Sequence, residues 1–296
     1  MKILILMALL PCFSLGAEEN YAGKPDWYVY RKGLEHYRNG DHGAALKAVK
    51  ELQDPSRVIP PEAYALLGRI YREEGENDLS ERYLKQALEK SGLFVVPDEK
   101  YAIQYLLADI HYQRKSYKNY ENVLENILSN QATYAENRYS RLRDGYLKTA
   151  VDENFDAFVR LYRLKDDYSR PAHLGLGIFA VRTGRENKAV LHLLFANLAA
   201  VSTLIDTLKD RDPDFVFTTL RDLLEKSGRL TSAAEYVEES ELHKGLYFLA
   251  AALHGSGART AARELWEIVR DFGGGEWKVR SRTQLASPQP EPLIAY

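Results

Sequence analysis

Cysteine is almost absent from this 296-residue sequence, which has one copy, Cys12, close to its N-terminus. With no second cysteine the chain forms no internal disulfide, so its stability has to come from an apolar core, which a chain of this length can bury. An excess of basic residues is also lacking, because the formal net charge is −2. Nucleic-acid-binding proteins usually carry such an excess, and we therefore expect no nucleic-acid partner.

Sequence motifs for catalysis and metal binding are missing as well. The chain has no G-x-S-x-G nucleophile motif and no H-E-x-x-H zinc motif. We therefore expect no metal, no cofactor and no enzyme activity, with a hydrolase near residues 139–168 as the catalytic alternative. The histidines are scattered along the chain without a cysteine to join them at a metal: His36, His42, His111, His173, His192, His243 and His254.

Residues 1–17 have the features of a secretory signal peptide. Lys2 supplies the positive charge, and an uncharged apolar run follows from Ile3 to Leu10, before small residues and then Glu18. This run is too short to span a membrane. We expect cleavage before Ala17, or directly after it as the alternative, and hence export to the periplasm or cell envelope.

Two further features bear on membrane association. Cys12 follows a segment similar to a lipobox, but Pro11 departs from the small-residue pattern of that motif, so a lipid anchor at Cys12 is the less favoured alternative. No charged residue occurs from Ala189 to Ile205, a run close in length to a membrane span. His192 and Asn197 lie inside this run, which favours a long buried helix over a membrane segment.

Residues 62–90 have the pattern of two short amphipathic helices joined by a glycine turn. Apolar positions of the first helix surround Gly68, whose missing side chain lets a neighbouring helix approach closely. The helix ends at Gly75, because glycine tolerates the positive φ of a C-terminal cap, and a second apolar pattern runs from Leu79 to Leu88. Neither helix can bury its apolar face alone, so copies of the pair are expected on both sides.

Such copies recur along the chain, with a degenerate one near Tyr139. Over about residues 26–270 the chain resembles the tetratricopeptide repeat family, whose period is about 34 residues. The resemblance implies an all-α, right-handed superhelix, or solenoid, of about six to seven helical hairpins. The copies start near Asp26, Pro61, Tyr101, Tyr139 and Pro171, then at a helix after Pro213 and at a last pair around Ala250 and Gly257.

Composition changes near Ser169, because seventeen of the twenty tyrosines precede it. We therefore expect a bend between Lys165 and Pro171. The expected parts are a signal peptide at 1–17, tyrosine-rich repeats at 18–168, further repeats at 169–272 and a glycine- and proline-rich tail at 273–296. Three glycines at 273–275 should end the last helix, and the prolines of the tail favour an extended chain.

In the tetratricopeptide repeat family the first helix of each pair lines a concave groove, with positions 2, 5, 9 and 12 facing inward. The resemblance therefore implies a groove rich in tyrosine and arginine, which are residue types of protein-binding hot spots. Alternatively, these tyrosines only cover the repeat core and keep their hydroxyls in water. The candidate groove residues are Tyr30, Tyr37, Arg69, Arg72, Tyr105, Asp109, Tyr112 and Arg143.

Function is expected from the same resemblance. It implies an exported scaffold that binds proteins through its concave surface and has no catalytic site. Some family members clamp a peptide C-terminus with lysine and asparagine, but Ala65 and Arg69 stand at those positions here, so such a ligand is not expected. The alternative is an accessory component of a periplasmic solute or lipid uptake system. Leu174, Ile178 and Val181, at groove positions of the fifth copy, would suit a small hydrophobic ligand.

Overall fold

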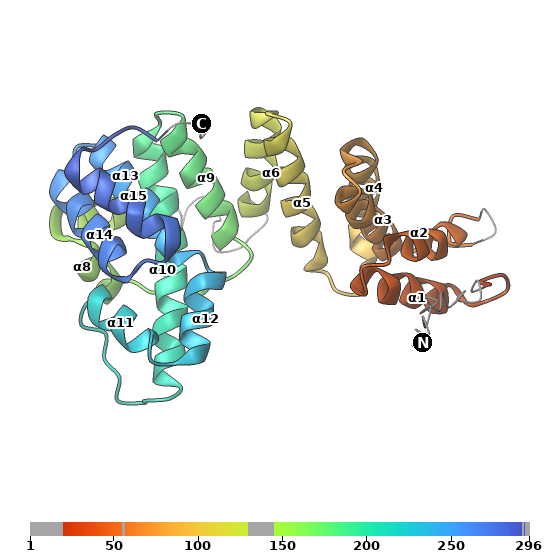
Figure 1. Ribbon diagram of the computed structural model, residues 1–296, viewed down its shortest axis with the longest axis horizontal. Coiled ribbons are helices and arrows are strands. Elements are labelled where there is room, and N and C mark those ends of the chain that lie inside the picture. The colour runs from red at the N-terminus through yellow and green to blue at the C-terminus, as the bar shows by residue number, and fades with distance from the viewer. Residues whose placement is uncertain (1–19, 55–56, 130–144, 292, 294–296) are drawn as a thin grey trace, which may run out of the picture. The chain divides into compact units, whose positions relative to one another are not determined.

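The computed structural model describes residues 20–54, 57–129, 145–291 and 293 (Figure 1). These residues form helices joined by turns and loops, without a β-strand among them, which confirms the predicted all-α class. The chain divides into two compact units, Met1–Pro97 and Asp98–Tyr296. The change in composition near Ser169 therefore lies within the second unit.

The first unit contains two helical hairpins, in which each helix packs against the next. Val29, Val49, Leu66 and Ile70 are fully or almost fully buried in their shared core. A salt bridge of 2.6 Å between Arg57 and Asp26 ties the loop after the first hairpin back to its start. The elements are α1 (Asp26–Arg38), α2 (His42–Glu51), α3 (Pro61–Glu73), α4 (Asn77–Glu89) and the short 3₁₀ helix η1 (Ser91–Leu93).

The second unit is built around three helical hairpins, with shorter elements packed against them. Within this unit α6 contacts α9, α10 contacts α13, and α15 contacts α14. Its elements are α5 (Glu99–Gln113), α6 (Tyr117–Ser129), the π-helix η3 (Thr149–Glu153), α8 (Phe155–Leu161), α9 (Arg170–Arg182), α10 (Glu186–Lys209), α11 (Leu220–Ser227), α12 (Thr231–Glu239), α13 (Leu242–Gly255), α14 (Arg259–Phe272) and α15 (Gly275–Ala286).

One close contact recurs in the hairpins of both units. The first helix carries a small residue, and a large apolar residue of the second helix follows it sixteen positions later in the sequence. At three glycines an added Cβ would lie within 2.5 or 2.6 Å of that partner, so only a hydrogen fits there. The pairs are Gly33 with Val49, Gly68 with Leu84 and Gly177 with Leu193; Ala108 with Leu124 and Ala250 with Trp266 follow the same spacing.

The turn of each of these hairpins also has one geometry. Seven residues after the small residue the backbone takes a positive φ, and the next residue donates its N–H to the carbonyl five positions earlier, at 2.8–3.0 Å. This bond belongs to the Schellman motif, which ends a helix in a left-handed residue. Lys115 takes this conformation in the α5–α6 turn. Glycine does so at Gly40, Gly75, Gly184 and Gly257.

The predicted fourth copy near Tyr139 does not form a hairpin in its described part, residues 145–168. After a helical turn at 145–148 the chain forms η3 and α8, then runs to Tyr168 without regular structure. These residues pack on α10, where the rings of Tyr146 and Phe195 lie 5.2 Å apart. α6 contacts α9 directly, so the third and fifth copies are neighbours.

The helix expected to begin at Pro213 begins instead at Leu220. Phe215 and Phe217 are both buried, and an irregular chain lets these alternate residues reach the core. The helix cap is Thr219, whose hydroxyl accepts a hydrogen bond from the Asp222 N–H at 3.2 Å. A helix start from Pro213 would have turned one of the two phenylalanines away from the core.

The C-terminal tail also differs from the sequence prediction. α14 ends at the three glycines, as predicted, and Gly273 takes an extended conformation. A further helix, α15, then forms from Gly275 to Ala286. The sequence prediction had placed this segment in a glycine- and proline-rich tail. Instead Trp277 packs its ring 5.5 Å from Tyr247 of α13, and this contact gives α15 a face on the core.

α10 is the long buried helix that the uncharged run predicted. By length and composition it is the one helix among the described residues that could cross a membrane, and 89% of the apolar window is buried inside the protein. Core helices of soluble proteins pass the same test. Inside the α9–α10 hairpin, His192 lies with its Nδ1 2.8 Å from Nδ1 of His173, and both rings are buried.

Burial keeps this histidine pair neutral. It lowers the pKa of His192 to about 3, with help from the nearby charges of Lys188 and Arg185, and it holds the pKa of His173 well below its ordinary value. One ring therefore donates its Nδ1–H to the unprotonated Nδ1 of the other. The pair is held by a neutral hydrogen bond and by the stacking of His173 on Phe195, whose ring centroids lie 4.8 Å apart.

A first prediction concerns the close contact at Gly68. Gly68→Leu should lower the free energy of unfolding by about 1–3 kcal/mol, because the new side chain overlaps Leu84 and forces α3 and α4 apart. Gly92→Leu adds the same atoms where nothing lies within 4 Å, and serves as the control in the same unit. Urea unfolding followed by circular dichroism measures both. Equal stability of the two variants would contradict the assigned contact.

A second prediction concerns pH. The folded-state pKa values of His173 and His192 lie below their unfolded values near 6.5. As the pH drops below about 6.5, the unfolded chain therefore binds protons before the folded chain does, and the free energy of unfolding falls. Each histidine should contribute a loss of about 1.4 kcal/mol per pH unit until its folded-state pKa is reached. A His173→Leu/His192→Leu double variant, measured by urea unfolding between pH 7.5 and 4.5, should have a shallower pH dependence than wild type. His42→Leu, outside the pair, should keep the wild-type slope, and identical slopes in all three proteins would contradict the prediction.

Candidate functional site

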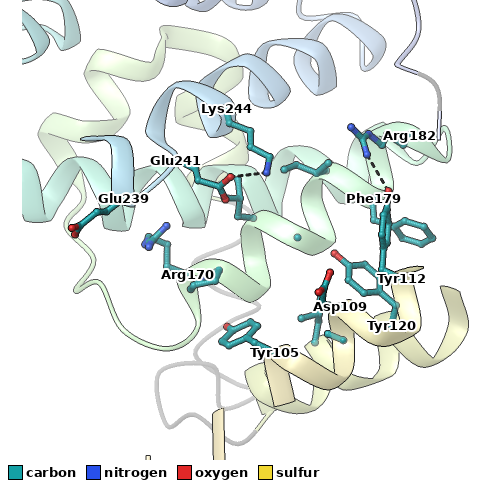
Figure 2. Close-up of a pocket in the computed structure, with 16 residues that line it drawn as sticks. Tyr105, Asp109, Tyr112, Tyr120, Arg170, Phe179, Arg182, Glu239, Glu241 and Lys244 are labelled. Carbon is teal, nitrogen blue, oxygen red and sulfur yellow. Dashed lines mark hydrogen bonds and ion pairs between the residues drawn. The ribbon is translucent and has the colours of Figure 1, made fainter. Parts of the chain in front are cut away.

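The second unit contains a hollow of about 440 Å³ between α5, α6 and α9 on one side and the α12–α13 connection on the other (Figure 2). Side chains from α5 and α9, the first helices of two hairpins, form its wall and floor. The hollow therefore lies where the family resemblance places a groove, on first-helix side chains within one unit.

Predicted groove positions of α5 and α9 meet in this hollow, except for Val181, which lines a different one. Tyr105, Asp109 and Tyr112 are positions 5, 9 and 12 of α5, counted from Tyr101, and all three line it. Leu174 and Ile178, the corresponding positions 5 and 9 of α9, form an apolar floor between them. Helical spacing alone thus brought together side chains that lie about 70 residues apart in the sequence.

An aromatic wall closes the hollow toward α6. The ring of Tyr112 lies 5.1 Å from Tyr120 and 6.4 Å from Phe179, and Tyr120 lies 5.5 Å from Phe179. Tyr120 fits there because residue 175 is glycine: a Cβ at Gly175 would lie 2.7 Å from the Tyr120 hydroxyl. Rings of this kind offer a rigid, mostly apolar contact surface with hydroxyls at its edge.

Charged side chains surround this wall, and most of them are engaged with the protein itself. Arg182 donates a 3.0 Å hydrogen bond to the Tyr112 hydroxyl, and Lys244 forms a 2.7 Å ion pair with Glu241, as Figure 2 shows. Arg170 binds Asp166 through Nε and the Ser240 carbonyl through Nη1. These contacts fix the shape of the rim.

Two tyrosines of the site have pKa values raised by burial, Tyr105 and Tyr120. Both phenols therefore stay neutral near pH 7 and can act as hydrogen-bond donors. Tyr105 donates its hydroxyl proton to the Tyr168 carbonyl, which fixes the chain entering α9. With neutral phenols and paired charges, the arrangement is suited to holding a ligand by contact and hydrogen bonding.

The catalytic alternative concerned the fourth copy, and a shallow hollow of about 800 Å³ does lie beside its described part. Ser202 lines this hollow, but its hydroxyl accepts a 3.2 Å hydrogen bond from the Leu164 N–H, and no histidine lines the hollow. In the described part of the chain, no cluster of three or more His, Cys, Asp or Glu residues could hold a metal ion.

The other sequence candidates lie elsewhere. Tyr30 and Tyr37 belong to the first unit, where both pack against its core and Tyr37 stacks on His42 at 5.6 Å. Arg69 and Arg72 are half-buried on α3 of the same unit, whereas Arg143 falls outside the described residues. The eight candidates are thus divided between two units, and the hollow gathers the three from α5.

Sequence reasoning missed several residues of the hollow. With Ala250 as the small residue of α13, Lys244 falls at position 2, which is one of the inward-facing positions. The same register could therefore have predicted Lys244. Tyr120 lies on a second helix and Arg182 lies one residue beyond position 12, so the register had no signal for either. Both reach the hollow because hairpins α5–α6 and α9–α10 are direct neighbours.

Comparison with known proteins adds one relative and no family. No family model matches the chain. The chain is similar to an uncharacterized protein of Treponema pallidum (strain Nichols), with 25% identity over 235 residues. The similarity covers 79% of this chain and 62% of the relative, so the chain spans less than two thirds of the relative's length.

Proposed function

We propose that the protein is a non-catalytic, exported scaffold of the tetratricopeptide repeat type, which binds a segment of a partner protein in the hollow of its second unit. The observation that carries the proposal is the wall of Tyr112, Tyr120 and Phe179 above the apolar floor of Leu174 and Ile178. Tyrosine-rich concave surfaces of this composition are typical of protein-binding hot spots.

The recurrent hairpin supports the repeat part of the proposal. Five hairpins share the small residue, the left-handed turn seven positions later and the apolar partner sixteen positions later, among the described residues. Repeated hairpins of one geometry stack on their neighbours in a solenoid, so this repetition supports the proposed architecture.

Export and the lack of catalysis rest on separate supports. Residues 1–17 have the signal-peptide pattern, and a mature chain cleaved at Ala17 would act in the periplasm or cell envelope. In the hollow, the charges of Arg170, Lys244 and Glu241 are paired within the protein and the two buried tyrosines stay neutral. A binding role uses such groups as they stand, without a metal or cofactor.

A third prediction tests this binding role. Glu239 is exposed on the rim of the hollow, and a photo-cross-linking residue placed there should capture a partner in the native envelope. The same residue placed at Arg229, which is 72% exposed and lies outside the hollow, should capture none. Adding Tyr112→Ala should weaken partner binding by about 2 kcal/mol, or about 30-fold, because it removes a ring at the centre of the wall. The capture yield at Glu239 measures the effect.

Tyr64→Ala is the matched control, because it truncates another half-buried tyrosine in the first unit. Circular dichroism of each variant separates lost binding from lost folding. Equal capture by wild type and a folded Tyr112→Ala variant would mean that the hollow is not the binding surface.

The second candidate function is an accessory role in solute or lipid uptake, which the apolar floor favours. Leu174, Ile178 and Leu124 could hold a small hydrophobic ligand under the tyrosine rings. Native mass spectrometry after gentle purification should then detect an added mass that Ile178→Asp removes and Val279→Asp, at a position 60% exposed, retains. A protein that stays free of added mass through purification from the envelope would contradict this candidate.

A further inference from the structure

The segment Ser287–Glu291 after α15 returns to the protein and is held there by specific contacts. Glu291 is 8% exposed, and its carboxylate accepts hydrogen bonds from Tyr247 of α13 and from Arg280 and Gln284 of α15. A buried carboxylate is costly unless it is fully paired, so these three donors form a built carboxylate site. Arg280 also lies over the rings of Tyr247 and Trp277, at 4.9 and 5.0 Å.

Backbone recognition accompanies this carboxylate site. The Gln284 side chain donates to the Gln289 carbonyl at 3.0 Å and accepts from the Gln289 N–H at 2.8 Å. Because Pro288 and Pro290 have no N–H, the Gln289 N–H is the one backbone donor of these three residues, and it is satisfied. Prolines also limit the freedom that a segment loses on binding.

The segment lies against the side of α13 that corresponds to the groove side of α5 and α9. In the register that starts at His243, positions 5, 9 and 12 of α13 are Tyr247, Ala251 and His254. Tyr247 binds Glu291, while Ala251 and His254 line a hollow of about 240 Å³ together with Pro288–Glu291. The chain's own tail thus occupies the kind of position that a repeat groove offers to a partner.

The composition of the segment suits this face, whose polar contacts to it come from side-chain donors. Tyr247, Arg280 and Gln284 all donate to the carboxylate of Glu291. A proline-rich segment brings few N–H donors of its own, so little of its backbone is left unpaired when it lies there.

We propose that this face of α13, α14 and α15 is a receptor for an extended, proline-flanked glutamate segment, and that Ser287–Glu291 fills it in cis as a displaceable ligand. The tail leaves about 240 Å³ unfilled, so a partner segment of the same pattern with larger neighbouring side chains would gain contacts that the tail lacks. Arg182 lines both this hollow and the tyrosine-walled hollow, but the residues that hold Glu291 do not line the latter, so the receptor does not depend on the role proposed for it.

A fourth prediction tests the receptor with a peptide of residues 286–291, acetylated and amidated, titrated calorimetrically into the full-length chain. Wild type should bind it weakly, because a tethered segment competes at a millimolar effective concentration. Glu291→Ala, which removes the anchor of the tail, should bind it at least about tenfold more tightly. If Glu291→Ala fails to fold, Glu291→Gln keeps the side-chain shape and takes its place.

Controls identify the binding chemistry. The same peptide with glutamine in place of its glutamate should lose the binding, and so should a chain that combines Glu291→Ala with Arg280→Ala. Adding Tyr105→Ala, in the other hollow, should leave the peptide affinity unchanged, which separates this test from that of the proposed function. The proposal is overturned if a folded Glu291 variant binds the peptide no better than wild type, or binds the glutamine peptide equally well.

Discussion

The structure depends on the contact between a small residue of one helix and a large apolar residue of the next. Where that residue is Gly33, Gly68 or Gly177, the partner side chain fills the place of a Cβ, so the two helices approach as closely as their backbones allow. The left-handed turn seven residues later reverses the chain within a few residues and keeps this contact in register. A larger side chain at one of these three glycines would separate the helices and open the shared core.

The same contact also determines which side chains lie beside the partner helix. Once position 8 faces the second helix, positions 5, 9 and 12 lie together on one flank of the first helix, about 40–100° around its axis from position 8. In the second unit these positions of α5 and α9 line the tyrosine-walled hollow, and those of α13 meet the C-terminal segment. One register therefore sets both the packing inside the hairpins and the side chains that line the hollows outside them.

This coupling explains what the sequence could and could not predict. Glycines and a period near 34 residues were sufficient to locate α1 to α6, α9, α10, α13 and α14, because each depends on contacts within about 30 residues. The failures involve contacts over longer distances. Phe215 and Phe217 override the helix start at Pro213, Tyr146 packs the degenerate copy on α10, and Trp277 draws a basic segment onto α13 as α15. For the hollow, the register found the α5 and α9 residues but had no signal for Tyr120, which depends on the absence of a side chain at Gly175.

The tyrosine-walled hollow and the hollow beside the C-terminal segment differ in how their polar groups are satisfied, although Arg182 lines both. On the tyrosine side its Nη1 binds the Tyr112 hydroxyl, and the neighbouring cations are paired with carboxylates, so what this side offers to a ligand is mainly aromatic surface. On the other side Tyr247, Arg280 and Gln284 all donate to the carboxylate of Glu291, so that side offers hydrogen-bond donors. A donor-rich face discriminates against ligands that bring their own donors and favours carbonyl-rich, proline-containing chains. The two faces therefore select different chemistry, although the same repeat geometry builds both.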